Sequence, residues 1–168
     1  IFNAGEAEIV RAALVSIIRL HPDVEISGNI AVLTPYRRQM SEIRKRIRND
    51  PLLSKIDVEV NTVDGIQGRE KEIVILSTVR SGSVSSGIGF VKDERRLNVA
   101  LTRSRHALLV VGNASLLASN SNHWEHFVSH CRSNSFLISL DSIQDMFPEA
   151  DSRRNVSPFS GISSQYIH

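Results

Sequence analysis

A polar loop between two apolar stretches, near the middle of the chain, most constrains how this sequence can fold. Residues 60–80 read as a short strand, a polar loop with two glycines and then a long apolar strand. Gly65 and Gly68 allow a positive φ or let the backbone approach a ligand closely. Open α/β sheets bind ligands at loops that follow the carboxyl ends of parallel strands. The stretch therefore indicates either a ligand-binding loop or a βαβ connection whose glycines only turn the chain.

Predicted strands and helices alternate around this loop. Apolar residues at helical spacing predict helices over about 4–20, 37–49, 94–104 and 124–131. Continuous apolar runs predict buried strands over residues 30–33, 58–60, 73–79 and 107–111, and an edge strand over 136–140. This alternation implies a mostly parallel central sheet with right-handed crossovers. The expected fold class is a three-layer α/β domain.

Composition and length are those of one soluble globular domain. The chain has 168 residues, of which 41% are hydrophobic and 23% charged. The single cysteine, Cys131, excludes an internal disulfide. No apolar run approaches the roughly 20 residues that span a bilayer. We expect a folded domain over residues 1–140, with a Gly/Ser-rich loop over 81–89, and a low-order tail over 141–168. Because the chain starts without Met, we interpret it as a fragment.

The basic residues are clustered, although the net charge is only +2. Residues 37–48 contain six Arg or Lys side chains and one acid, Glu42. A run of this kind is usually a solvated helix face, and it can also be a surface that binds phosphates.

Several kinds of chemistry are not favoured by the sequence. The pattern G-x-x-x-x-G-K-[ST], which cradles nucleotide phosphates, is absent. Asp93 and Glu94 do not follow a buried strand, so they fit a helix cap better than a magnesium pair. His123, His126 and His130 share a helical face with Cys131, but no further zinc ligands are suitably placed. What is left is a set of arginines and hydroxyls at strand ends, which suit the binding of phosphates.

Three segments, in order, resemble helicase motifs. Residues 33–39 (LTPYRRQ) resemble motif IV of the superfamily 1 helicases, residues 62–71 (TVDGIQGREK) resemble motif V, and residues 95–105 (RRLNVALTRSR) resemble motif VI. The match is to the branch that contains the nonsense-mediated-decay helicase and senataxin, and it covers about residues 1–140. It implies the second, C-terminal RecA-like domain, with a P-loop-NTPase-type sheet. Motifs I and II, which hold the phosphates and magnesium, are expected upstream.

The resemblance implies roles at the nucleotide. Arg103 matches the motif VI arginine finger, which stabilises the transferring phosphoryl group. Arg37 matches a second such arginine, with its neighbour Arg38 as the alternative. Tyr36 matches an aromatic residue that stacks on the adenine. Glu70 matches a carboxylate that contacts the ribose.

Further roles follow from the same resemblance. Gly68 matches a close backbone approach to phosphate. Gln67, which we group with Arg103 and Arg37 as catalytic, would couple the nucleotide and strand surfaces. Thr62, and more loosely Thr34, match positions that touch the nucleic-acid backbone. Arg96 is expected to hold the motif VI helix in place.

The implied function is that of one half of a motor. A senataxin-like helicase uses ATP with Mg²⁺ to move 5′ to 3′ along single-stranded RNA or DNA. It is expected in the nucleus, with the cytoplasm as the alternative. The first RecA-like domain of the same protein is the implied partner, so this chain alone should be inactive. The alternative is a nucleic-acid-binding regulatory module that never joins an ATPase. An unrelated α/β module for a small phosphate ligand would require three coincidental motif matches.

Overall fold

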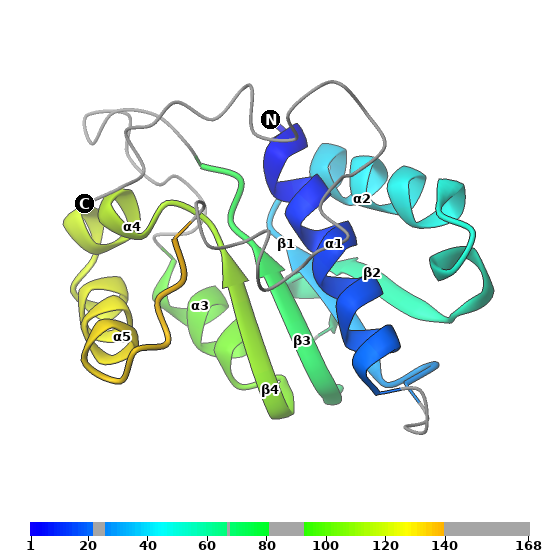
Figure 1. Cartoon of the computed structure of the whole chain (residues 1–168). Coiled ribbons are helices and arrows are strands. Elements are labelled where there is room, and N and C mark those ends of the chain that lie inside the picture. The colour runs from blue at the N-terminus through cyan, green and yellow to red at the C-terminus, as the bar shows by residue number, and fades with distance from the viewer. Residues whose placement is uncertain (22–25, 67, 81–92, 140–168) are drawn as a thin grey trace.

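A computed structural model describes residues 1–21, 26–66, 68–80 and 93–139 (Figure 1). Gln67, the predicted loop over 81–89 and the predicted tail over 141–168 lie outside the described residues. The sheet has four parallel strands in the order β2-β1-β3-β4. They are β1 (Ile30–Thr34), β2 (Val58–Thr62), β3 (Lys71–Ser77) and β4 (Ser104–Val111).

Helices cover both faces of this sheet, as Figure 1 shows. On one face lie α1 (Ala4–Leu20) and α2 (Arg37–Asn49), followed by the 3₁₀ turn η1 (Leu53–Lys55). On the other face lie α3 (Glu94–Leu101), α4 (Ala114–Asn120) and α5 (Asn122–Ser133), together with the 3₁₀ turn η2 (Asp64–Ile66). The predicted three-layer α/β architecture is confirmed. None of the described helices is long and apolar enough to cross a membrane.

Two apolar cores lie on either side of β1, which is buried along its whole length. Ile30 and Val32 pack against α1 and α2, whereas Ala31 and Leu33 pack against α3 and Trp124. Successive side chains of a strand point to opposite faces, so a central strand with helices on both sides must be apolar throughout. This explains why residues 30–33 form a continuous apolar run.

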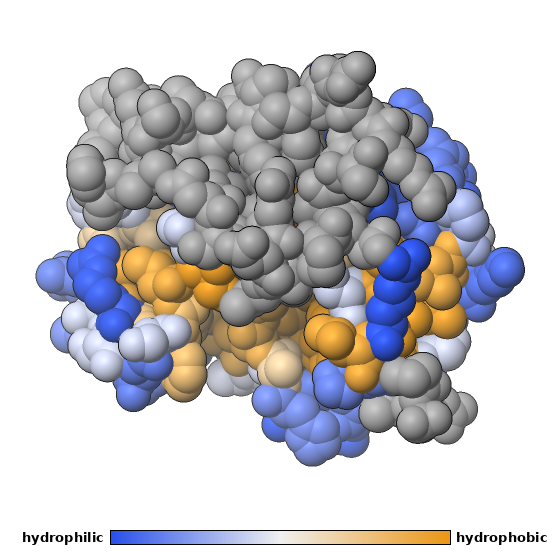
Figure 2. Space-filling view, viewed as in Figure 1, coloured by the Kyte–Doolittle hydropathy of each residue, from blue (hydrophilic) through white to orange (hydrophobic). Residues whose placement is uncertain are grey.

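The ends of the sheet decide where polar residues meet. All four strands run in the same direction, so the loops after β1, β2, β3 and β4 share one edge, which we call the carboxyl edge. The residues that precede the strands share the opposite, amino edge. A groove over β4 between α1 and α5 is lined by Ile9, Leu109 and Phe127, and Figure 2 shows apolar side chains on this face.

The structure corrects the predicted elements. The helix predicted over 94–104 is too long, since α3 ends at Leu101 and the backbone of its C-cap, Thr102, is no longer helical. The edge strand predicted over 136–140 is wrong, since residues 136–139 form no strand and Leu140 lies outside the described part of the chain. Helix α4 was not predicted; the Asn113 side chain caps it by accepting a hydrogen bond from the Leu116 amide at 2.9 Å.

Candidate nucleotide and nucleic-acid site

The predicted site residues fall into two groups at opposite edges of the sheet. Thr34 and Thr62 are register partners at the carboxyl edge. The Lys71 amide bonds to the Arg103 carbonyl at the amino edge. Ile30 pairs with Ile73 in neighbouring parallel strands. Thr34 comes four residues after Ile30 and Lys71 comes two residues before Ile73, so the two are offset by six residues along the strand direction. At about 3.3 Å per residue, the two groups are roughly 20 Å apart.

The two threonines at the carboxyl edge are not equally accessible. Thr34 is fully buried, and its hydroxyl has no hydrogen-bond partner among the described residues. The Thr62 hydroxyl is half-buried and accepts a hydrogen bond from the Gly65 amide at 3.2 Å. A buried hydroxyl without a partner costs about 1–3 kcal/mol, and such groups often mark functional positions.

Tyr36 also lies at the carboxyl edge, immediately before α2, where it contacts Arg80. The Arg80 Nε donates a hydrogen bond to the Tyr36 hydroxyl at 2.9 Å, and its guanidinium carbon lies 5.7 Å from the ring centre. Sequence reasoning did not single out Arg80, although it directly follows the strongest predicted strand. Tyr36 and Arg80 together form an aromatic and cationic surface, which suits a base or a phosphate.

Arg37 and Arg38 occupy the first turn of α2, and both are exposed. The guanidinium of Arg38 lies 4.5 Å above the ring of Phe2, so it is engaged in a cation–π contact. The Arg37 side chain makes no hydrogen bond or ion pair with any part of the chain that the structure describes. The two alternatives therefore differ in their contacts, and the choice between them stays a prediction.

Arg103 lies at the amino edge, between the end of α3 and the start of β4. It was predicted on the same helix as Arg96, and that placement is wrong because the helix ends two residues earlier. Its Nε donates to the Val99 carbonyl at 3.0 Å, and one terminal nitrogen donates to the Thr102 hydroxyl at 3.0 Å. The other lies 3.4 Å from the Arg69 carbonyl. No carboxylate of the described residues pairs with it, so its charge is not neutralised there.

Glu70 also lies at the amino edge and pairs with a residue that the sequence did not suggest. Its carboxylate accepts from Arg105 Nε at 3.0 Å, whereas Arg69 and Lys71, its neighbours in the chain, both pair with Glu59. Arg105 also pairs with Glu72 at 3.3 Å. The Glu70 and Arg105 side chains are at least half exposed, so this pair can open to a ligand at little cost.

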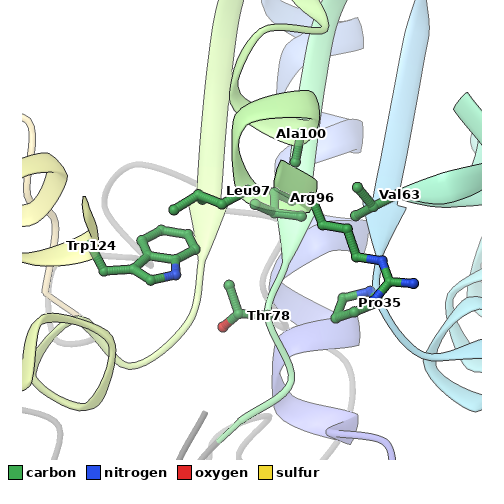
Figure 3. A pocket seen from close by; sticks show the side chains of 8 residues that line it. Pro35, Val63, Thr78, Arg96, Leu97, Ala100 and Trp124 are labelled. Atoms are coloured by element: carbon green, nitrogen blue, oxygen red, sulfur yellow. The ribbon is translucent and has the colours of Figure 1, made fainter. Parts of the chain in front are cut away.

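Arg96 joins the central loop to α3. Its guanidinium donates hydrogen bonds to Asp64 at 2.9 Å and to Asp93 at 3.2 Å, and the bond to Asp64 raises the pKa of Arg96. Asp93 is the N-cap of α3, as predicted. Figure 3 shows Arg96 beside a small pocket of about 20 Å³, with the fully buried Trp124 on the opposite side. The expected structural role of Arg96 therefore has a geometric basis.

The two glycines of the loop, Gly65 and Gly68, differ in what a side chain at their position would meet. Gly68 has a φ of +81°, which favours glycine, and a Cβ there would meet nothing. At Gly65 a Cβ would collide with the side chain of Asn61. That amide accepts a hydrogen bond from the Thr62 amide at 2.8 Å and donates to the Gly65 carbonyl at 3.3 Å. A larger residue at position 65 would displace the Asn61 side chain from these hydrogen bonds, whereas backbone conformation favours glycine at position 68.

A buried polar network supports the carboxyl edge from the α1 side. The Glu6 carboxylate accepts hydrogen bonds from the Ser77 hydroxyl at 2.7 Å and from the Val79 amide at 2.8 Å. Gln39, which is also fully buried, donates to Ser77 at 3.1 Å. Val79 has a φ of +70°, a strained conformation for a β-branched residue. The network thus fixes the backbone directly before Arg80.

Burial raises the pKa of Glu6 to about 7, although the hydrogen bonds from Ser77 and Val79 lower it. The side chains and amide that bond to this carboxylate within the described residues are all uncharged. The carboxyl group therefore changes its protonation state near neutral pH.

The described side chains at the two edges suit the phosphates and ribose of a nucleotide better than they suit a metal ion. Among the described residues, no group of three or more His, Cys, Asp or Glu side chains could hold a metal ion. His123 instead lies 3.2 Å from Glu94. Arginines without carboxylate partners suit phosphate oxygens, and an exposed carboxylate suits a ribose hydroxyl.

Comparison with known proteins identifies the family. The sequence matches the family described as AAA domain over residues 1–115. It is 47% identical over 120 residues to "ATP-dependent helicase upf1" of Schizosaccharomyces pombe, covering 68% of this chain and 13% of that protein. It is 43% identical over 122 residues to "Helicase sen1" of the same organism, covering 71% of this chain and 7% of that protein.

A third relative has a different printed role. "DNA polymerase alpha-associated DNA helicase A" of Saccharomyces cerevisiae is 42% identical over 123 residues, covering 73% of this chain and 17% of that protein. The chain therefore spans less than a fifth of the length of these relatives. Together with the parallel sheet and the matched motifs, these similarities show that the chain belongs to the superfamily 1 helicases of the Upf1/Sen1 type.

Proposed function

We propose that this chain is the second motor domain of an ATP-dependent, senataxin-like helicase that moves 5′ to 3′ on single-stranded RNA or DNA in the nucleus. Its partner in this proposal is the first RecA-like domain of the same protein, which holds the phosphates and Mg²⁺. The magnesium ion neutralises charge on the phosphates during hydrolysis. Opening and closing of the two domains around ATP converts hydrolysis into steps along the strand.

The observation that carries this proposal is the Arg103 guanidinium at the amino edge, which has no carboxylate partner among the described residues. It rests on main-chain carbonyls and a hydroxyl, contacts that can be exchanged for a γ-phosphate without leaving a buried carboxylate unpaired. Such an arginine stabilises the charge that develops during phosphoryl transfer. Glu70 lies at the same edge, where it can contact the ribose of the same nucleotide.

The second part of the proposal concerns the carboxyl edge. Thr34 and Thr62 lie there, and Thr62, the accessible one of the two, is proposed to contact the strand backbone, whereas Thr34 is fully buried beside it in the sheet. Tyr36 and Arg37 lie with them, roughly 20 Å from Glu70 by strand geometry. That separation favours stacking of Tyr36 on a base of the strand over stacking on the adenine of an ATP held at the amino edge. Gly68, three residues before Lys71 at the amino edge, is proposed to let the backbone approach a phosphate closely, and Gln67 is proposed to couple the two sites.

The assignment of the strand to one edge and of ATP to the other is tested in the full-length protein with two sets of variants, each of which should affect only one of the two activities. We expect Tyr36→Ala and Thr62→Val to raise the Kd for a single strand in the absence of nucleotide. We expect Arg103→Ala to lower ATP turnover and leave that Kd unchanged. If Tyr36→Ala instead increased the KM for ATP and left the strand Kd unchanged, Tyr36 would be assigned to stacking on the adenine.

The isolated chain offers a second test. Without the phosphate loop of the first domain, the nucleotide meets only half of its site. Calorimetric titration with a non-hydrolysable ATP analogue should show no binding tighter than high micromolar, and no hydrolysis of ATP. Low-micromolar binding would contradict the assignment of this chain as a second domain. The regulatory-module alternative predicts that the full-length protein also lacks ATP turnover.

A further inference from the structure

Four basic side chains of α2 share one exposed face of the helix. At 3.6 residues per turn, Arg37, Arg44, Lys45 and Arg48 fall within an arc of about 100°. The buried residues of α2, Gln39, Ile43 and Ile47, lie on the opposite side. All four basic side chains are exposed, and we call this set the basic face. Hydrophilic side chains line the margin of the molecule in Figure 2 where Figure 1 places α2.

The charges of the basic face are not neutralised within the described residues. Arg46, on another side of α2, pairs with Glu8 at 3.3 Å and with Glu42 at 3.2 Å. In contrast, Lys45 and Arg48 form no ion pair within the described ranges. Arg44 donates to the main-chain carbonyl of Val60 at 2.6 Å, a contact that leaves its charge uncompensated. The helix thus places its acidic partners away from the basic face.

The basic face is continuous with the carboxyl edge of the sheet. Arg37 begins α2 three residues after Thr34, and the contact of Arg44 with Val60 places the face beside β2. Thr62 is the last residue of β2. From Arg37 to Arg48 the helix rises about 16 Å, a length that spans several phosphates of a nucleic acid.

We infer that the basic face binds the phosphate backbone of the nucleic acid beyond the nucleotides contacted at the carboxyl edge. The inference rests on the proposed function, since it extends the same strand path. A nucleic acid fits better than an acidic protein, because the face contains no aromatic or apolar anchor of the kind that protein interfaces use. Contacts of this kind add affinity without sequence preference.

The test uses the full-length protein with Lys45→Gln/Arg48→Gln. Its control is Lys55→Gln/Arg132→Gln, which removes the same charge from exposed positions elsewhere on the domain. For single strands, each phosphate contact contributes about −0.7 to the slope of log affinity against log salt. Two lost contacts should therefore reduce the slope by about 1.4, which weakens binding at 0.1 M salt by about 25-fold when the affinities are equal at 1 M. The control should keep the slope of the wild-type protein.

Three nucleic-acid probes locate the contact. The first is the shortest oligonucleotide that saturates ATP turnover, the second is a longer single strand, and the third is the short strand joined to a duplex. The loss of affinity should be absent with the first probe. A loss of affinity for the longer single strand would assign the basic face to single-stranded backbone. A loss only for the strand joined to a duplex would assign it to duplex backbone.

An unchanged salt slope with all three probes would overturn the inference. Unchanged nucleic-acid binding together with weaker binding of polyglutamate would assign the face to an acidic polypeptide and would also overturn it. Failure of the proposed function is a separate result. In that case the wild-type protein shows no strand-stimulated ATP turnover, whatever the salt slope is.

Discussion

The carboxylate of Glu6 accepts a 2.7 Å hydrogen bond from the hydroxyl of Ser77, although the two residues are 71 positions apart. The bond joins the first turn of α1 to the carboxyl end of β3. The same oxygen of Glu6 holds the amide of Val79, whose backbone is in the left-handed region. A buried acid with no cationic partner among the described residues therefore sets the conformation of Val79, the residue before Arg80. Arg80 in turn contacts Tyr36.

This arrangement predicts that stability falls as pH rises. The pKa of Glu6 is raised from 4.5 to about 7, so the folded state binds a proton that the unfolded state has released. The contribution is fully present below about pH 4.5 and is lost as the pH rises through 7, a change of about 3 kcal/mol. Urea unfolding between pH 4.5 and 8 measures it, and Glu6→Gln should remove this part of the slope.

A second variant checks the cause of that slope. The hydrogen bond from Ser77 lowers the pKa of Glu6, so Ser77→Ala should move the loss of stability to higher pH. Equal pH dependence in the wild-type protein, Glu6→Gln and Ser77→Ala would show that Glu6 is not the titrating group.

Trp124 should be a main determinant of stability on the α3 side of the sheet. It is fully buried, lines the small pocket opposite Arg96 and packs edge-on against Phe127 at 5.8 Å between ring centres. Trp124→Ala should cost about 3–5 kcal/mol in the free energy of unfolding. Phe136→Ala is the control, because that ring is 66% exposed and should change stability by less than about 0.5 kcal/mol. Similar losses in both variants would contradict this packing.

The sequence was sufficient for features that depend on local pattern. The apolar spacing of α1, the continuous runs of β1 and β3 and the Asp93 cap of α3 were all predicted. The helix predicted over 94–104 was too long, because the apolar spacing ends at Leu101 and residues 102–104 carry no apolar residue or cap that would mark the end of the helix. Helix α4 was missed for the opposite reason, since its seven residues are too few to show a period.

Contacts between distant segments could not be read from the sequence. Glu70, just before β3, pairs with Arg105 of the neighbouring strand β4, although Arg69 and Lys71 are its neighbours in the chain. The buried Gln39 looked like an ordinary polar residue of a basic helix. The motifs identified Tyr36 and Glu70 as site residues, and strand register was needed to show that they lie at opposite edges. Local spacing has no information on which edge a loop residue reaches.

The central loop provides a prediction that separates its two glycines. A Cβ at Gly65 would collide with Asn61, so Gly65→Ala should cost about 1–3 kcal/mol. Asn61→Ala removes the obstacle and should rescue part of that loss, an interaction measured by a double-mutant cycle. Gly68→Ala should lose about 1 kcal/mol through its positive φ alone, and Asn61→Ala should not rescue it. If the stability losses of Gly65→Ala and Asn61→Ala were additive in the double variant, the collision between the two positions would be refuted.

Arg103 and Arg105 provide a matched pair for the chemical step. They are two residues apart and have the same side chain, but Arg105 is paired with Glu70 and Glu72, whereas no described carboxylate pairs with Arg103. An arginine that reaches a γ-phosphate contributes roughly 10³–10⁵ in rate, so Arg103→Ala should cut ATP turnover of the full-length protein at least about a hundredfold. Lysine keeps the charge and loses the planar fork, so Arg103→Lys should restore little.

Two further measurements on the same preparations distinguish catalysis from folding. Strand affinity without nucleotide and the melting temperature should stay close to wild type in Arg103→Ala, because its contacts are main-chain carbonyls and one hydroxyl at the surface. Arg105→Ala breaks two exposed ion pairs and should leave turnover within a few-fold of wild type. If Arg103 only supported the fold, Arg103→Ala would lower the melting temperature and strand affinity together with turnover. Normal turnover in Arg103→Ala would end its assignment to the γ-phosphate, and an equal loss in Arg105→Ala would mean that the charge of the whole amino edge, rather than one guanidinium, acts on ATP.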